Sequence, residues 1–355
     1  MATLSRRQML AGTLATAALA GRLPGQAPPD TTRTPDLITA ETQRAIDRGL
    51  AWLAKRQLLS GRNEGAFGHG GYQGGVAVCS LAGLAFMCSG SPPGQGPFGK
   101  QIDRCIRFLT SCVQDSGYIS VPGIGQDNMY GHGFAMLFLS EAYGMSDRSD
   151  IDATVGEKLR KAVKLTCDCQ NEAGGWRYQP VKSDADLSIT ICQIMGLRAA
   201  RDAGLHVPDE VRSRCIDYVR KSQNPDGGFR YQIGSGGGSS FPLTAAGVVS
   251  LYSAGIYEGE PITKALQWLM NYVPRRGADA THGYYFYGHY YAVQAMWHAG
   301  GEYWARWYPA IRDALLARQT GDGSWPDGEV CPEFGTAMAC IILQMPNNFL
   351  PIFSP

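Results

Sequence analysis

One seven-residue tract occurs three times in this chain and constrains what the chain can fold into. The copies are QNEAGGW at residues 170–176, QNPDGGF at 223–229 and QTGDGSW at 319–325. Gly174 and Gly227 are 53 residues apart, and the 96 residues from there to Gly323 make two periods of 48. Self-similarity at a fixed period is typical of a fold built from repeated supersecondary units.

Weaker copies of the same turn fill the gaps in this spacing. They are Gly65-Ala66-Phe67, residues 114–118 with Gly117 at their centre, and Gly283-Tyr284. Together with the three clear copies they make six turns, so the sequence predicts six repeats.

Each predicted repeat contains two kinds of segment. The segment before the turn is amphipathic and charged, and these segments are 41–58, 100–113, 157–169, 209–222, 261–273 and 303–318. The segment after the turn has no Asp, Glu, Lys or Arg, and these segments are 74–90, 129–140, 187–197, 241–257, 284–297 and 334–346. An amphipathic helix buries one face, whereas a helix that is apolar all round must be covered all round.

Two concentric rings of helices satisfy both patterns. The uncharged helices would line the inside, and the amphipathic helices would bury one face against them. The sequence therefore predicts an all-α fold, an (α/α)6 barrel of six helix-pair repeats. Most of the uncharged segments are too short and too rich in Gly, Ala and Ser for transmembrane helices, which need about 20 apolar residues. No membrane span is expected in the mature chain.

The repeated turn itself is expected to be structural. A glycine in a left-handed conformation would end each outer helix. The aromatic residue would then pack between neighbouring outer helices, and the glutamine would satisfy backbone groups left open at a helix end.

Composition excludes some classes of function. A net charge of +1 with no basic block argues against a nucleic-acid partner. Half of the ten cysteines lie within the apolar helical patterns, where a free thiol behaves as a small hydrophobic group: Cys79, Cys88, Cys192, Cys215 and Cys340. Mostly free, buried thiols are therefore expected. Cys167 and Cys169 would not share a helix face, so no metal site is predicted, and no cofactor either.

The N-terminus is typical of an export signal. Arg6-Arg7 precedes a short apolar run over 11–20, which ends in the small-residue sequence Ala18-Leu19-Ala20. This pattern predicts a twin-arginine signal peptide over residues 1–20 and a periplasmic or extracellular location. Residues 21–38 contain four prolines and are expected to form a flexible linker. Residues 39–355 would then form a single toroid domain.

On these turns the chain resembles the squalene–hopene cyclase and protein prenyltransferase superfamily, whose α/α toroids carry such repeats. The resemblance covers roughly residues 41–350. It implies a toroid with a cavity that accepts an isoprenoid-type apolar ligand.

The resemblance also implies candidate catalytic residues. Acid-initiated cyclases of the superfamily carry Asp-x-Asp-Asp-Thr-Ala at the start of an inner helix, and Asp184-Ala185-Asp186-Leu187-Ser188 stands at the matching place. Asp186 occupies the position of the proton donor, while Leu187 and Ser188 depart from the pattern. Whether this chain is an enzyme therefore stays open at this point. The Asp-x-Cys zinc motif of protein prenyltransferases does not occur at an inner-helix start, so protein prenylation is not expected.

Inner helices that run in one direction would bring six N-termini to one mouth of the barrel, each with a partial positive charge. A buried carboxylic acid with a second carboxylate nearby can protonate an alkene, and aromatic rings can stabilise the resulting cation. The candidate catalytic residues at this mouth are Asp186, Asp184, His289 and His132. The candidate ligand-binding residues are Tyr130, Tyr178, Tyr231, Tyr285, Tyr287 and Glu333.

Each of these assignments has a structural alternative. Asp184 or Ser183 could simply cap the following helix. The two histidines could tie adjacent repeats together through hydrogen bonds, and the tyrosines after the turns could serve packing between repeats.

Three functions remain open from the sequence. The first is an isoprenoid-binding or isoprenoid-transforming protein. The second is a non-catalytic binding or scaffold toroid. The third is a carbohydrate-active enzyme, in which Asp184 or Asp186 would form a carboxylate pair with Glu333.

Overall fold

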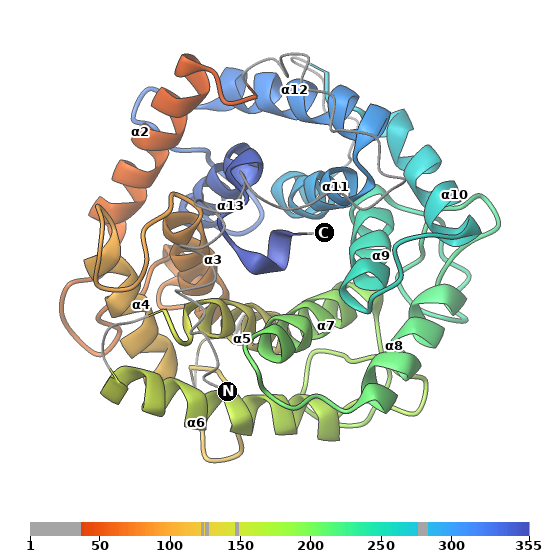
Figure 1. Cartoon of the computed structure of the whole chain (residues 1–355), viewed down its shortest axis with the longest axis horizontal. Coiled ribbons are helices and arrows are strands. Elements are labelled where there is room, and N and C mark those ends of the chain that lie inside the picture. The colour runs from red at the N-terminus through yellow and green to blue at the C-terminus, as the bar shows by residue number, and fades with distance from the viewer. Residues whose placement is uncertain (1–36, 122–123, 125–127, 146–148, 276–282, 355) are drawn as a thin grey trace, which may run out of the picture.

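The computed structural model describes residues 37–121, 124, 128–145, 149–275 and 283–354. The predicted signal peptide and most of the predicted linker lie outside these residues. Within them, twelve α-helices form two concentric rings (Figure 1). The predicted (α/α)6 barrel is confirmed. The described residues contain only isolated β-bridges and no strand.

The outer ring consists of the amphipathic helices, as predicted. They are α2 (Ala40–Arg56), α4 (Gly99–Ser111), α6 (Ser149–Asp168), α8 (Asp209–Lys221), α10 (Glu260–Leu269) and α12 (Gly301–Arg318). The inner ring consists of the helices that contain the uncharged segments, although α5, α7 and α13 extend beyond those segments to include charged residues. They are α3 (Val76–Met87), α5 (Met129–Ala142), α7 (Leu187–Asp202), α9 (Phe241–Ser253), α11 (Tyr285–Ala299) and α13 (Pro332–Gln344).

Burial follows the two patterns. In α5, twelve consecutive residues from Gly131 to Ala142 are buried, because inner helices on both sides and the outer ring cover this helix. In the outer helix α4, burial is concentrated on the face that carries Ile102, Cys105, Ile106 and Leu109. The opposite face is half-buried or exposed. The ring closes where α13 packs on both α2 and α3.

In five of the six copies the repeated turn brings its glycine against the next outer helix, whereas a Cβ on Gly283 would lie 3.2 Å from Oε1 of Glu329. The glycine φ is positive in all six copies: +93° at Gly65, +92° at Gly117, +97° at Gly174, +90° at Gly227, +106° at Gly283 and +97° at Gly323. A Cβ on Gly174 would lie 2.1 Å from the carbonyl oxygen of Arg214 in α8. A Cβ on Gly323 would lie 3.0 Å from the carbonyl oxygen of Arg48, so the last turn contacts the first outer helix. Glycine is required by both the backbone conformation and the contact.

In the last copy of the turn, the aromatic residue lies between outer helices, as predicted. Trp325 donates from Nε1 to the Leu315 carbonyl of α12 at 2.8 Å, and its ring lies against Gly49 of α2. Its backbone N–H donates to Oγ1 of Thr336 in α13 at 3.0 Å. The turn thus joins two outer helices and one inner helix.

In four of the six turns a glutamine amide bridges the turn to the next outer helix. Nε2 donates to the carbonyl of the turn glycine and to a carbonyl in that helix, at 2.8–3.0 Å: Gln57 to Gly65 and Gln101, Gln170 to Gly174 and Val211, Gln223 to Gly227 and Pro261, Gln319 to Gly323 and Ala45. The sequence pattern did not identify Gln57, because it lies eight residues before its glycine instead of four.

The C-terminal segment turns into the middle of the ring (Figure 1). Leu350, Ile352 and Phe353 are buried there, and Nη2 of Arg198 donates to the Ser354 carbonyl at 3.0 Å. Since Arg198 lies near the C-terminal end of α7, this segment covers the end of the barrel opposite the N-termini of the inner helices.

None of the ten cysteines, which all lie among the described residues, is in a disulfide, and eight of them are buried. None of the helices in the described part of the chain has the length and hydropathy needed to cross a membrane.

Replacing Gly174 by Ala should lower the free energy of unfolding by at least ~3 kcal/mol, because Ala is strained at this φ and its Cβ would clash with a carbonyl oxygen. Gly204→Ala is the matched control: Gly204 has a φ of +89°, but nothing lies within 4 Å of its added Cβ. That variant should lose only about 1 kcal/mol. Urea unfolding midpoints measure both effects, and equal losses would contradict the role of the close contact.

Candidate functional site

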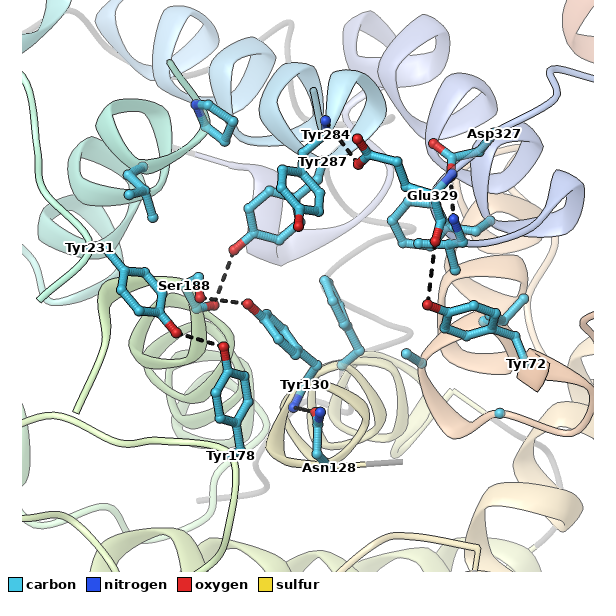
Figure 2. Close-up of a pocket in the computed structure, with 18 of the residues that line it drawn as sticks. Tyr72, Asn128, Tyr130, Tyr178, Ser188, Tyr231, Tyr284, Tyr287, Asp327 and Glu329 are labelled. Carbon is cyan, nitrogen blue, oxygen red and sulfur yellow. Dashed lines mark hydrogen bonds between the residues drawn. The ribbon is translucent and has the colours of Figure 1, made fainter. Parts of the chain in front are cut away.

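A cavity of about 830 Å³ lies at the N-terminal ends of the inner helices (Figure 2). Every inner helix contributes to its wall: Ala77 of α3, Tyr130 of α5, Ser188 of α7, Leu243 of α9, Tyr287 of α11 and Phe334 of α13. The predicted convergence of six N-termini at one mouth is therefore observed. The volume is within the range of about 300–1,000 Å³ that is typical of small-molecule pockets.

Hydroxyl groups gather on one side of this cavity. Tyr130 donates from its hydroxyl to Oγ of Ser188 at 2.5 Å, and the hydroxyls of Tyr178 and Tyr231 are 2.5 Å apart (Figure 2). We call these four residues the hydroxyl cluster. Tyr287 lies beside it and donates to the Ser188 carbonyl at 3.0 Å. Four of the five predicted ligand-binding tyrosines thus line the cavity.

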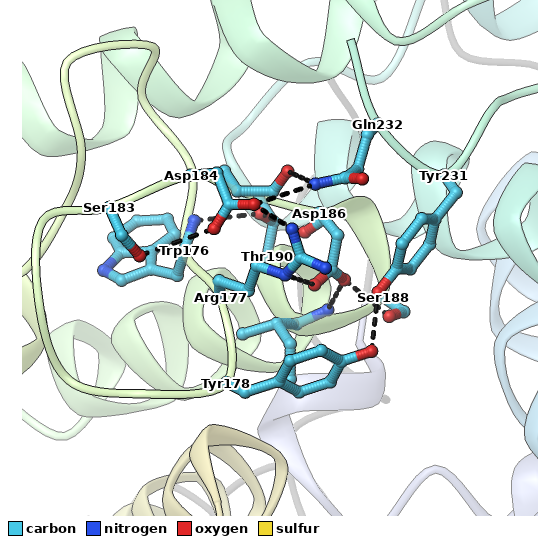
Figure 3. A network of polar contacts seen from close by, with 12 residues as sticks. Trp176, Arg177, Tyr178, Ser183, Asp184, Asp186, Ser188, Thr190, Tyr231 and Gln232 are labelled. Carbon is cyan, nitrogen blue, oxygen red and sulfur yellow. Dashed lines mark hydrogen bonds and ion pairs between the residues drawn. The ribbon is translucent and has the colours of Figure 1, made fainter. Parts of the chain in front are cut away.

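Asp186 lies directly behind the hydroxyl cluster and is fully buried. It is the N-cap of α7: Oδ1 accepts from the Ile189 N–H at 2.9 Å and from Oγ of Ser188 at 2.6 Å (Figure 3). Asp186 therefore both caps α7 and is connected to the cavity through Ser188. The path from Oδ1 to the cavity runs through Ser188 to Tyr130.

Burial raises the pKa of Asp186 above the ordinary value of a carboxyl group. The hydrogen bonds from Ser188 and from the Ile189 N–H favour the charged form and offset part of this rise, as does Arg177, whose Nε lies 3.9 Å from Oδ2. Burial is the larger effect. Burial likewise raises the pKa of the Tyr130 and Tyr287 hydroxyls, so these phenols stay neutral donors.

Asp184 points away from the cavity. Its side chain is half exposed, forms an ion pair with Arg177 and accepts from Nε2 of Gln232 at 3.3 Å. Arg177 lies between the two carboxylates (Figure 3). Asp184, the predicted second carboxylate, thus lies near Asp186 but on the solvent side of the cavity wall.

His132 and His289, both predicted as catalytic, also lie outside the cavity wall. Nδ1 of His132 accepts from the Ile119 N–H at 3.1 Å, and Nε2 lies 2.9 Å from Oγ1 of Thr166 in α6. His132 thus ties an inner helix to the preceding turn and to an outer helix. The ring of His289 packs against Phe241 and Trp307, with ring centroids 4.9 and 5.9 Å apart.

Tyr285 and Glu333, both predicted as ligand-binding, do not line the cavity. The guanidinium of Arg318 lies over the Tyr285 ring at 4.0 Å from its centroid. Glu333 is buried, and its Oε1 accepts from Nε of Arg56 in α2 at 2.9 Å. This ion pair joins the last inner helix to the first outer helix.

The cavity rim carries two carboxylates that sequence reasoning missed. Asp327 accepts from the N–H groups of Glu329 and Val330 at 2.9 and 2.6 Å, and Oε2 of Glu329 accepts from the Tyr284 N–H at 2.9 Å. Both residues follow the third clear copy of the turn, and that position was the only available signal. Across the described residues, no group of His, Cys, Asp and Glu has the arrangement needed to hold a metal ion.

Residues 134–278 match the family described as the prenyltransferase alpha-alpha toroid domain. No curated protein sequence matches the chain significantly. Together with the fold and the cavity, the family match confirms the resemblance to the terpenoid cyclase-like toroid superfamily.

Solved structures share the fold at low sequence identity. The type II terpene cyclase MstE from Scytonema, in complex with merosterolic acid A, is 17% identical, with a TM-score of 0.60 over 85% of this chain and 96% of that chain. An α-1,6-mannanase from Salegentibacter sp. HEL1_6, in complex with α-1,6-mannotriose, is 8% identical, with a TM-score of 0.59 over 85% and 98%. An α-amylase from Clostridium perfringens is 12% identical, with a TM-score of 0.59 over 85% and 97%. Identities this low establish the fold alone.

The stability of the protein should depend on pH through His132. Burial lowers its pKa to about 4, from 6.5. Between these values the unfolded chain binds a proton that the folded chain does not bind, so stability falls as the pH falls through this window. The loss from pH 7 to pH 5 should be roughly 2 kcal/mol.

His132→Asn should reduce this pH dependence by a similar amount, because Asn keeps an acceptor for the Ile119 N–H but does not titrate. The control variant is His206→Asn, which makes the same substitution at an exposed histidine. A His132→Asn variant with an unchanged pH dependence would contradict the neutral, buried state of this ring.

Proposed function

We propose that this chain is an exported, terpenoid cyclase-like protein that binds an isoprenoid-type apolar ligand in the toroid cavity, and that Asp186 is the acid that acts on it. The observation that carries the proposal is the hydrogen-bonded path from buried Asp186 through Ser188 to Tyr130 on the aromatic wall. It connects an acid of raised pKa with a cavity lined by aromatic and aliphatic side chains.

The chemistry that fits this path is protonation of an alkene. When Asp186 is protonated, the two hydroxyls must turn over, because at present Tyr130 donates to Ser188 and Ser188 donates to Asp186. Asp186 then gives its proton to the Ser188 oxygen, Ser188 gives its own to the Tyr130 oxygen, and Tyr130 gives its own to an alkene carbon of the ligand. The alkene π electrons form the new C–H bond and leave a cation on the neighbouring carbon. Aromatic rings of the wall, Tyr287 and Phe134 among them, would stabilise that cation. The Asp186 carboxylate left behind is stabilised by Arg177.

Two alternatives have less support from the geometry. A scaffold toroid with a filled barrel does not account for a cavity of about 830 Å³. A carbohydrate-active enzyme that pairs Asp184 or Asp186 with Glu333 lacks its second member at the cavity, since Glu333 is held by Arg56. The α-amylase and the α-1,6-mannanase share the fold with this chain. In the test below, recovery of a bound sugar would favour this alternative.

Organic extracts of the purified protein should contain an isoprenoid that mass spectrometry identifies. In Asp186→Asn, the ligand should still bind, since Asn keeps the cap, but conversion should fall at least ~100-fold because the acid is absent. A protonation–deprotonation cyclisation gives an isomer of equal mass, so chromatographic retention separates substrate from product.

Asp226→Asn is the control for this experiment, because Asp226 is an exposed carboxylate of the next repeat that accepts from the Gly228 N–H within its turn and does not line the cavity. It should leave both the ligand and its conversion unchanged. Recovery of a sugar, or of no small molecule from any variant, would contradict the proposal.

The proposed export rests on Arg6 and Arg7. Replacing both by Lys should block the twin-arginine route and retain the chain in the cytoplasm with its signal peptide uncleaved. Cell fractionation with intact-mass measurement tests this result. Arg220→Lys combined with Lys221→Arg is the control, because this exposed pair lies in the mature domain, and the change keeps both charges and leaves the signal intact. It should not affect export.

A further inference from the structure

We infer that the cavity ligand carries an uncharged oxygen, as a hydroxyl or carbonyl group, that docks on the hydroxyl cluster, and that it does not carry a diphosphate. This inference rests on the proposed function, because it specifies the class of isoprenoid that the cavity accepts. It depends on which hydrogen bonds and ion pairs the polar groups around the cavity already form.

The hydroxyl cluster is the first observation. Each hydroxyl has one proton to donate and two lone pairs. The Tyr178–Tyr231 contact uses one of the two protons of that pair, and Tyr130 uses its proton on Ser188. Lone pairs on these oxygens remain at the cavity surface. A hydrocarbon pressed against them would leave them desolvated without a partner, at a cost in free energy. A ligand hydroxyl or carbonyl at this place restores the hydrogen bonds that water would otherwise make.

The helix N-termini are the second observation. Free N–H groups at a helix N-terminus are a common site for phosphate, but here side chains already occupy them. Oδ1 of Asn128 accepts from the Tyr130 N–H at 2.9 Å, Asp186 accepts from the Ile189 N–H, and Glu329 accepts from the Tyr284 N–H. Three of the six N-termini are therefore closed to an anion.

Charge at the rim is the third observation. Asp327 and Glu329 place two carboxylates on the cavity wall, and the residues lining it in the described part of the chain include no Lys, Arg or His. Arg177 lies behind the wall and is paired with Asp184 and Asp186. A diphosphate would enter this site against repulsion and without a cation to neutralise it, whereas a neutral oxygen meets donors and acceptors.

Binding of three C20 probes tests the inference: geranylgeraniol, geranylgeranyl diphosphate, and the same chain ending in a methyl group. Titration of the mature protein, followed by isothermal calorimetry or tryptophan fluorescence, gives the dissociation constants. Geranylgeraniol should bind about tenfold more tightly than the hydrocarbon, the gain expected for a satisfied hydrogen bond, and more tightly than the diphosphate.

Two variants locate the effect. Tyr178→Phe combined with Tyr231→Phe keeps both rings and removes both hydroxyls, and should bring the alcohol-to-hydrocarbon ratio close to one. Tyr257→Phe is the control, because Tyr257 stacks on Tyr252 away from the cavity. Glu329→Gln keeps an acceptor for the Tyr284 N–H while removing the charge, and should improve diphosphate binding several-fold.

The outcomes separate this inference from the proposed function. Equal binding of all three probes, or tightest binding of the diphosphate, would overturn the inference and leave an isoprenoid-binding cavity. Binding of none of them would overturn the proposed function and the inference together.

Discussion

The close approach of the turn glycine to the backbone of the next outer helix, which occurs in five of the six turns, is the contact on which the rest of the structure depends. A positive φ and a carbonyl oxygen where a Cβ would stand both require glycine at Gly174, and a similar requirement recurs around the ring. The glutamine bridges fix the same junctions by hydrogen bonds. Because Gly323 reaches Arg48, the last repeat meets the first, and the ring has no open end to cap.

Closure of the ring orients the inner helices and so builds the cavity. Six N-termini meet at one end, while the C-terminal segment with Ile352 and Phe353 fills the other. Polar groups are therefore concentrated at a single mouth, where the caps of the inner helices and the residues of the turns come together. Asp186 shows how one residue serves both purposes. It caps α7 and, through Ser188, reaches the cavity surface from a position that water does not reach.

The sequence predicted the ring and the region of the site better than the individual site residues. Tyr130 and Tyr287 line the cavity, whereas His132 and His289, each two residues further along the same helix, face the outer ring. Tyr285, two residues before Tyr287, likewise points away. Residues two apart on a helix do not share a face, so only one member of each pair could reach the cavity. The rim residues Asp327 and Glu329 lie in a connection that carries no periodic signal.

The sequence by itself determined the number of repeats, the alternation of half-buried and fully buried helices, and the glycine turns, because spacing and polarity record these directly. Tertiary structure alone decided which face of each inner helix lines the cavity. An inner helix that is apolar all round has no polar side to reveal its orientation. Its rotation is set by packing between two rings, and with it the choice of which tyrosines, histidines and carboxylates meet at the mouth.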